Sequence, residues 1–270
     1  MPWEGSQIFV ASCVISEGED NSTLDLRRAI PVAGQSAYVG VAQPQWTASN
    51  ELLFLSDVDR YTNPWVASYT SETELNVESV LPAPIREDFG ELDWSLGLSS
   101  YALFDDDNVV YSSFRNGRAQ IYLVDLVNRT FRELETPYAL IRFIRHVSKG
   151  KVTFLGKMSN SEDAVIELTL DIPEGKPKYR VIKGQDQPNE PSLPPSFISL
   201  PQPLQIRVLI EGFRLPVHVV YYPPTNPEYL GGIPGELPPS IMDIHGGPNL
   251  LVDQSLDWKK QYFTSRGWAW

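Results

Sequence analysis

An apolar segment that ends in paired glycines is the part of this sequence best suited to chemistry. After Ile241 and Ile244 comes a short run of four residues, His245, Gly246, Gly247 and Pro248. Glycines have no Cβ, so their backbone N–H groups can approach a substrate carbonyl oxygen and stabilise the charge that develops on it. The run predicts an oxyanion-binding loop, and a plain glycine turn is the alternative. We expect the His245 side chain to shape this loop rather than to act as a base.

The sequence does not contain the other groups that such chemistry needs. A nucleophile elbow has the pattern Gly-x-Ser-x-Gly, and the nearest match, at residues 97–101, lacks the closing glycine. Of the 3 histidines, His146 and His218 lie after or within strand-like segments, so we interpret both as structural. There is no His-x-x-x-His pair and no cysteine pair. We therefore predict neither a metal site nor a cofactor.

Three charged residues are candidates for lining a substrate cavity. Arg115 precedes Asn116-Gly117, and its guanidinium could hold a peptide carboxylate or carbonyl group. Glu87 and Glu91 follow a polar insertion, and their carboxylates would suit the free amino group of a peptide. The alternatives are a tight hairpin turn at Asn116-Gly117 and solvated loop charges at the two glutamates.

Composition and charge exclude several classes of partner. The 270 residues are 42% hydrophobic, and 34 acidic against 22 basic side chains give a net charge of −12. This charge repels phosphate backbones and anionic lipids, so we expect no nucleic-acid or membrane partner. A single cysteine, Cys13, expected in the core, and the lack of a signal peptide favour a cytoplasmic protein. A targeting signal preceding residue 1 and oligomerisation are left open.

Residues 1–171 have the pattern of an all-β protein. Short runs rich in Val, Ile, Tyr, Phe and Trp alternate with Asp, Asn, Gly, Ser and Pro, as in strands and turns. We expect strands at 7–14, 25–31, 51–56, 64–69, 100–104, 108–114, 119–126, 130–135, 140–145, 151–155 and 164–170. Similar stretches are anchored at Ile8, Leu53, Val109 and Val152, with spacings of 45, 56 and 43 residues, which suits four-stranded propeller blades. The pattern predicts a partial β-propeller, and a two-sheet sandwich is the alternative.

The composition changes after this part of the chain. Residues 172–203 are rich in proline, which predicts a linker. Residues 204–270 then show strand-like segments at 205–211, 217–222 and 240–245, the last apolar enough to be buried on both faces. A helix is expected at 255–267, capped by Ser255 and ended by Gly267, with another strand starting at Trp268. Strands interrupted by a helix indicate the start of an α/β domain.

Two stretches of this last part carry a resemblance to a known family. They are residues 243–248, Asp-Ile-His-Gly-Gly-Pro, and residues 261–269, Gln-Tyr-Phe-Thr-Ser-Arg-Gly-Trp-Ala; similarity is looser at 1–6, 43–46 and 88–94. The sequence resembles the prolyl oligopeptidase family of serine peptidases, in particular its dipeptidyl-peptidase and acylaminoacyl-peptidase branches. The resemblance implies that residues 1–171 are the later part of a β-propeller and that 204–270 begin an α/β-hydrolase domain.

The resemblance also implies a function. The chain would be a fragment of a serine peptidase that hydrolyses short peptides, of aminopeptidase, dipeptidyl-peptidase or acylaminoacyl-peptidase type. Gly247 would supply one oxyanion donor, and the triad of Ser, Asp and His would lie beyond residue 270, so the fragment alone is predicted inactive. The alternatives are a non-catalytic propeller interaction module and an esterase of the same fold.

Overall fold

The computed structural model describes residues 5–17, 22–26, 28–36, 38–71, 74–90, 97–171, 175–184, 194–229, 231–246 and 250–270. By their internal contacts they form two compact units. The first unit comprises residues 1–114, 121–134 and 143–152, and the second comprises 115–120, 135–142 and 153–270.

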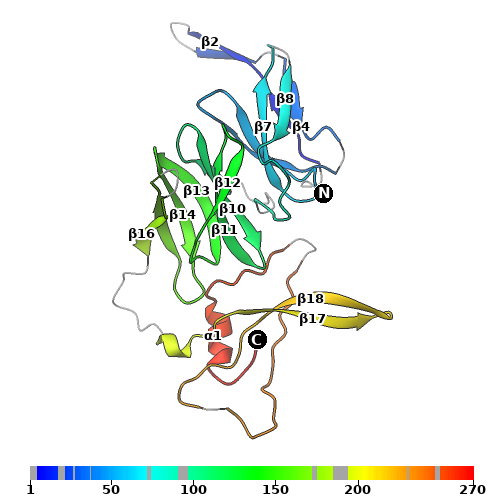
Figure 1. The fold of residues 1–270 in the computed structure, drawn as a ribbon, viewed down its shortest axis with the longest axis vertical. Helices are drawn as coiled ribbons and strands as arrows, with labels where there is room; N and C mark the ends of the chain where they lie inside the picture. The colour runs from blue at the N-terminus through cyan, green and yellow to red at the C-terminus, as the bar shows by residue number, and fades with distance from the viewer. Residues whose placement is uncertain are drawn as a thin grey trace. The chain divides into compact units, whose positions relative to one another are not determined.

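Three sheets contain four strands each, and in each sheet the strands that are neighbours in the chain are also neighbours in space (Figure 1). The first sheet is β5 (Val41–Trp46), β6 (Leu52–Ser56), β7 (Asn63–Tyr69) and β8 (Leu75–Ser79). The second is β9 (Tyr101–Leu103), β10 (Asn108–Arg115), β11 (Arg118–Asp125) and β12 (Thr130–Leu134). The third is β13 (Leu140–Ser148), β14 (Lys151–Lys157), β15 (Ala164–Thr169) and β16 (Lys178–Gly184). Such up-and-down sheets of four strands are the blades of β-propellers.

The core of the first unit is built from the apolar strands of the first two sheets. All five residues of β6 are buried, and Val109 and Tyr111 of β10 belong to the same cluster as Leu53 and Leu55 of β6. These strands form because β-branched and aromatic residues pack well on a pleated surface, and their polar flanks begin the turns. The all-β prediction for this part of the chain is confirmed in the described residues.

Three strands were not predicted from the sequence. β5 contains Pro44 and its register shifts between Ala42 and Gln45, so it lacks a regular alternation. β8 is short and polar, and β16 lies inside the segment 172–203, where the proline content predicts a linker. Because β16 pairs with β15 from Ala164 to Thr169, the third sheet extends into that proline-rich segment.

The N-terminal part forms two separate two-stranded sheets. β1 (Ile8–Val10) pairs with β4 (Ile30–Ala33), and β2 (Cys13–Glu17) pairs with β3 (Ser22–Leu26). The expected single strand at 7–14 is therefore divided between two sheets. Cys13 is exposed, so its expected place in the core is wrong. The reason is that β2 belongs to a ribbon of only two strands, which leaves the cysteine side chain open to solvent.

A long hairpin follows the short 3-10 helix at Pro195–Phe197. β17 (Gln202–Ile210) pairs with β18 (Phe213–Tyr221) along its whole length, and Figure 1 shows the two as a yellow ribbon. One face of this hairpin is apolar and consists of Leu204, Ile206, Val208, Leu215, Val217 and Val219. In the described part of the chain this face is open, since Leu204 and Ile206 are each 45% exposed.

Backbone hydrogen bonds connect the last two residues of the sequence to two distant segments, at Tyr222 and at Ser240. Tyr222 and Trp270 exchange two bonds of 2.8 and 3.0 Å, and Ser240 forms a parallel bridge with Ala269. The expected strand at 240–245 is reduced to this bridge, and its predicted burial is wrong, because Met242 is 85% and Ile244 78% exposed. Among the described residues, the backbone of this segment pairs with Ala269 on one side and with no strand on the other. A buried central strand therefore does not form there.

The helix α1 (Trp258–Thr264) lies within the predicted range but is shorter. Its cap is Asp257, whose side chain accepts a bond from the Lys259 N–H, and not Ser255 as predicted. The Ser255 hydroxyl instead donates to the Asp253 carboxylate, so it is not available as a cap. Gly267 has φ +87°, which confirms its expected role at the end of the helix.

Candidate functional site

The predicted oxyanion loop follows a parallel backbone pairing. The N–H of Ile241 donates to the carbonyl of Ala269 at 2.9 Å, and the N–H of Ala269 donates to the carbonyl of Pro239 at 2.8 Å. A parallel pair needs a crossover connection, usually a helix, and α1 lies between its two members in the chain. This pairing fixes the point from which the chain runs toward His245.

The described part of the loop leaves its backbone open. His245 is exposed, and its Nδ1 lies 3.4 Å from the carbonyl oxygen of the adjacent Gly246. A Cβ built at Gly246 would meet nothing within 4 Å. Gly247 and Pro248 lie outside the described residues, so their roles stay predictions. The open backbone at Gly246 is compatible with the approach of a ligand.

The segment that returns from the loop to α1 is anchored by hydrogen bonds. Gln254 is buried, and its Nε2 donates to the carbonyl oxygen of Asn116 at 2.6 Å. The N–H of Leu256 donates to the carbonyl oxygen of Met158 at 2.8 Å. Asn116 lies in the turn of the β10–β11 hairpin, and Met158 directly follows β14. Both acceptors belong to the same compact unit as the segment 250–257. Residues 250–257 are thereby tied to the sheets as well as to α1.

Two further contacts hold the start of α1. The Asp253 carboxylate accepts from the N–H of Ser255 at 2.8 Å and from the hydroxyl of the same residue. The indole Nε1 of Trp258 donates to the Glu162 carboxylate at 2.5 Å. These bonds order the segment on either side of Leu256.

The buried Lys260 side chain of α1 lies between an aromatic ring and a carboxylate. The ammonium of Lys260 lies 4.9 Å from the ring centroid of Tyr222 and 3.7 Å from the Asp257 carboxylate. Burial raises the pKa of the Tyr222 hydroxyl far above its ordinary value, and the charges of Asp253 and Asp257 raise it further. The Tyr222 hydroxyl therefore keeps its proton to a higher pH than an ordinary tyrosine does, as expected of a side chain that serves packing.

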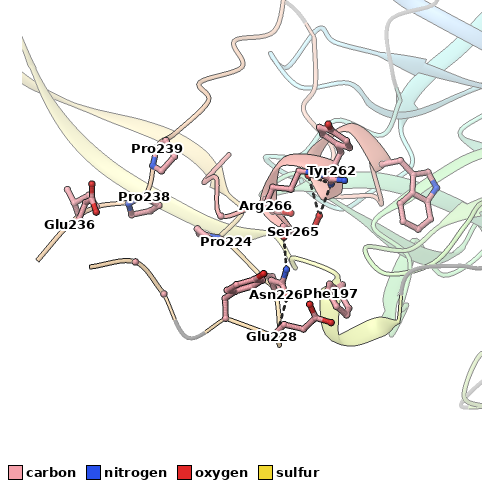
Figure 2. Close-up of a pocket in the computed structure, with 18 residues that line it drawn as sticks. Phe197, Pro224, Asn226, Glu228, Glu236, Pro238, Pro239, Tyr262, Ser265 and Arg266 are labelled. Atoms are coloured by element: carbon pink, nitrogen blue, oxygen red, sulfur yellow. Dashed lines mark hydrogen bonds between the residues drawn. The ribbon is translucent and has the colours of Figure 1, made fainter. Parts of the chain in front are cut away.

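A cavity of about 1280 Å³ opens beside the C-terminal end of α1 (Figure 2). The Arg266 guanidinium stacks over the Tyr262 ring at 3.8 Å and donates to the Tyr262 carbonyl at 2.9 Å. On the other side, the amide of Asn226 donates to the carbonyl of Ser265 at 2.9 Å. Neither His245 nor Gly246 belongs to the described lining. This cavity is therefore a separate feature from the predicted oxyanion loop.

Glu87 lies in the interior of the first unit. It is 7% exposed, and its carboxylate accepts bonds from the Ser113 hydroxyl at 2.6 Å and the Tyr122 hydroxyl at 3.0 Å. These contacts hold the loop that precedes β9 against strands β10 and β11. The structure thus gives Glu87 a structural function, and its suggested contact with substrate stays a prediction.

Arg115 and Glu91 are the other two suggested cavity residues. Arg115 is exposed and ends β10, directly before the turn of the β10–β11 hairpin. Asn116 and Gly117 have φ values of +53° and +74°, as a two-residue type I′ turn requires, so the hairpin turn named as the alternative is present. Glu91 lies outside the described residues. The substrate contacts of both residues stay predictions.

The histidines outside the loop make local contacts. The Nδ1 of His146 lies 2.8 Å from the carbonyl oxygen of Leu103, and the Nε2 of His218 lies 3.4 Å from the amide of Gln205. Among the described residues, no group of three or more His, Cys, Asp or Glu side chains could hold a metal ion. No helix in the described part of the chain is long and apolar enough to cross a membrane.

Sequence reasoning did not identify Gln254 and Gly117 as neighbours. A Cβ at Gly117 would lie 3.1 Å from the Val252 carbonyl oxygen and 3.2 Å from the Gln254 Nε2. Asn116 and Gln254 are 138 residues apart, and neither belongs to a motif that predicts a pairing. The one available signal was the Asn-Gly turn itself.

Comparison with known proteins establishes the fold. No protein-family model and no curated protein matches the sequence. The structure of a puromycin hydrolase has a TM-score of 0.80 and 22% identity over 100% of this chain and 37% of that one. A puromycin-hydrolyzing peptidase of Mycobacterium tuberculosis has a TM-score of 0.75 and 24% identity, over 100% of this chain and 38% of that one.

A more distant solved structure has the same fold. The acylaminoacyl peptidase of Pyrococcus horikoshii has a TM-score of 0.56 and 14% identity, over 99% of this chain and 38% of that one. In all three comparisons the chain spans little more than a third of the other protein. The expected likeness to peptidases of this kind is thus confirmed for the fold.

Proposed function

We propose that this chain is part of a serine peptidase of the prolyl oligopeptidase family, and that the whole protein hydrolyses short peptides. Two findings support the proposal: the fold is similar along the whole chain to peptidases, and the sequence 243–248 has the family's Asp-Ile-His-Gly-Gly-Pro pattern. In this proposal residues 1–171 belong to a β-propeller. Residues 172–203 connect it to residues 204–270, which begin an α/β-hydrolase domain.

The order of the backbone segments around Trp270 is the observation that carries the proposal. Tyr222 pairs with Trp270, and the adjacent Ala269 pairs in parallel with Ser240. The parallel members are joined through α1, as in the βαβ units of which α/β sheets are built. The glycine run follows the carboxyl end of the 239–241 segment, which is the end where α/β sheets bind their ligands.

The proposed mechanism assigns one step to residues of this chain. A serine hydroxyl attacks the substrate carbonyl carbon while a histidine takes its proton, and an aspartate orients the histidine. The N–H of Gly247 and the N–H after the nucleophile donate to the oxyanion of the tetrahedral intermediate. The histidine then gives its proton to the leaving amine, and water hydrolyses the acyl-enzyme. We place the serine, aspartate and histidine beyond residue 270.

The substrate class is proposed from the fold and from the names of similar proteins. A propeller over the active site would admit short peptides only. Two of the similar proteins hydrolyse puromycin according to their names, so puromycin is a sensible first substrate. An esterase of the same fold and a non-catalytic interaction module are the competing functions.

The test uses the full-length protein that contains this chain. We expect labelling by a fluorophosphonate probe of serine hydrolases, and turnover of puromycin or of aminoacyl and acetyl-aminoacyl chromogenic amides. Labelling with turnover of esters alone would support an esterase. Absence of both labelling and turnover in a folded preparation would support an interaction module.

A further inference from the structure

The segment 250–257 connects the glycine run to α1, and the side chain of Gln254 anchors it to a distant part of the chain. Gln254 is 1% exposed, although it is an amide in a segment without regular structure. Its Nε2 donates at 2.6 Å to the backbone carbonyl of Asn116, in the turn of the β10–β11 hairpin. A buried amide that loses such a partner is left unsatisfied, which makes this contact hard to give up.

The hairpin turn is shaped to receive this segment. Gly117 has φ +74°, and the space where a Cβ would lie is closed by the Val252 carbonyl oxygen at 3.1 Å and the Gln254 Nε2 at 3.2 Å. Val252 and Gln254 therefore pack directly on the turn, and a side chain at position 117 would press on both of them in a backbone conformation that favours glycine. The packing and the hydrogen bond fix the same few residues.

The turn is itself held firmly. Arg118, the first residue of β11, donates to the Ser159 hydroxyl at 3.3 Å and to the Pro137 carbonyl at 3.2 Å. The next residue, Ala119, donates its N–H to the carbonyl of Ala139 at 2.8 Å. The turn thus provides a stable surface for the segment that follows the glycine run.

We propose that Gln254 and Gly117 are positioning residues, which hold the oxyanion loop in register through the segment 250–257. This inference rests on the proposed function, because it assumes that Gly247 donates to the oxyanion. A segment released from the turn would let the loop shift relative to the nucleophile. A shift of about 1 Å in a catalytic group can reduce a rate by about 10²-fold.

The test compares two glycine variants of the full-length protein that carry the same backbone strain. Gly117→Ala introduces a Cβ at φ +74° against Val252 and Gln254, whereas Gly150→Ala introduces one at φ +76° with nothing within 4 Å. We expect Gly117→Ala to lower kcat by about 10- to 100-fold with KM changed less than about twofold. Gly150→Ala should leave both constants within about twofold of wild type at a temperature where both variants are folded.

A second variant removes the hydrogen bond without changing the turn. Gln254→Met keeps the length of the side chain and lacks the donor, so it should lower kcat in the same way with KM unchanged. Because a smaller fraction of folded enzyme would also lower the apparent kcat at unchanged KM, kcat is expressed per active site titrated with the fluorophosphonate probe. A positioning role lowers the rate per titrated site, whereas a loss of stability lowers only the number of titrated sites. Gln254→Met also provides the answer if Gly117→Ala does not fold.

The outcomes distinguish this inference from the function on which it rests. If Gly247→Ala lowers kcat but Gly117→Ala and Gln254→Met behave like Gly150→Ala, the positioning role is wrong and the oxyanion assignment stands. If Gly247→Ala leaves kcat unchanged in a folded, active enzyme, the oxyanion assignment fails, and the positioning role fails with it.

Discussion

The side-chain amide of Gln261 in α1 binds the backbone of Ser199 at two points. Its Oε1 accepts the Ser199 N–H at 2.7 Å, and its Nε2 donates to the Ser199 carbonyl at 3.1 Å. Both residues are fully buried. The amide therefore replaces the backbone partners that Ser199 would have in a sheet, and it ties α1 to the segment that precedes β17.

Replacing Gln261 should destabilise the second unit. In Gln261→Leu both backbone groups of Ser199 lose their partner in a buried place, so the free energy of unfolding should fall by roughly 2 to 5 kcal/mol. Urea denaturation followed by tryptophan fluorescence measures the change. Gln205→Leu, at an exposed position of β17, is the control and should change stability by less than about 0.5 kcal/mol. Equal effects of the two substitutions would contradict the role of the two hydrogen bonds.

The 270-residue chain by itself should not hydrolyse peptides. An oxyanion loop without a nucleophile and a base cannot form a covalent intermediate. The measurement is turnover of aminoacyl and acetyl-aminoacyl chromogenic amides by the purified chain. Activity that persists through stringent purification, at a constant ratio to the protein, would show that the chain contains a catalytic centre of its own.

In the full-length protein, Gly247→Ala should affect the transition state more than the ground state. The added Cβ would keep the backbone away from the oxyanion, and losing such a donor costs about 10²- to 10³-fold in kcat, or about 3 to 4 kcal/mol. His245→Ala is the comparison, because it alters the shape of the loop without removing that N–H, and should cost less. A kcat within a few-fold of wild type for folded Gly247→Ala would return the run to a plain glycine turn.

Glu87→Ala should lower stability. The hydroxyls of Ser113 and Tyr122 both donate to this buried carboxylate, so its removal leaves them without that acceptor. We expect a loss of roughly 2 to 4 kcal/mol in the free energy of unfolding, measured by urea titration. The exposed Glu74 serves as control in Glu74→Ala. A large increase in KM for Glu87→Ala with unchanged stability would instead support the suggested contact with substrate.

The buried hydroxyl of Tyr179 should make the free energy of unfolding decrease at alkaline pH. Burial raises the pKa of its hydroxyl from 10.0 to about 12. The unfolded chain loses this proton near pH 10, whereas the folded chain keeps it, so the contribution is complete below pH 10 and is lost as the pH rises through about 12. Tyr179→Phe keeps the ring beside Tyr138 and Phe154, and its stability should decline less steeply between pH 10 and 12 than that of wild type. Parallel curves for the two proteins would contradict the assignment.

Sequence patterns predicted those strands whose burial follows a simple rule. β6 is apolar over most of its length and β10 contains the apolar run Val109 to Tyr111, so these runs sufficed to place both strands. β16 has mostly exposed side chains and lies among prolines, so it shows no apolar pattern, and its pairing with β15 depends on backbone hydrogen bonds. An edge strand pairs on one side only and here keeps most of its side chains exposed, so it has no apolar pattern by which the sequence could reveal it.

In the candidate site, the sequence predicted only the features that depend on a short local motif. The glycine run was identified because glycine has a specific backbone use, and Gly267 was identified for the same reason. The contact between Gln254 and Asn116 joins positions 138 residues apart, and its donor and acceptor are an amide and a backbone carbonyl, which occur everywhere in a sequence. Only the folded arrangement makes that pair specific.

The hairpin β17–β18 has a consequence for handling the 270-residue chain in solution. Its sheet has two strands only, so among the described residues each strand presents one row of unpaired backbone donors and acceptors beside the open Leu204 and Ile206. Another molecule can extend such a sheet strand by strand. The rate at which monomers associate would then depend on how often two molecules collide. Dilute samples should therefore stay monomeric longest, and the initial rate of increase in light scattering should rise with the square of the protein concentration.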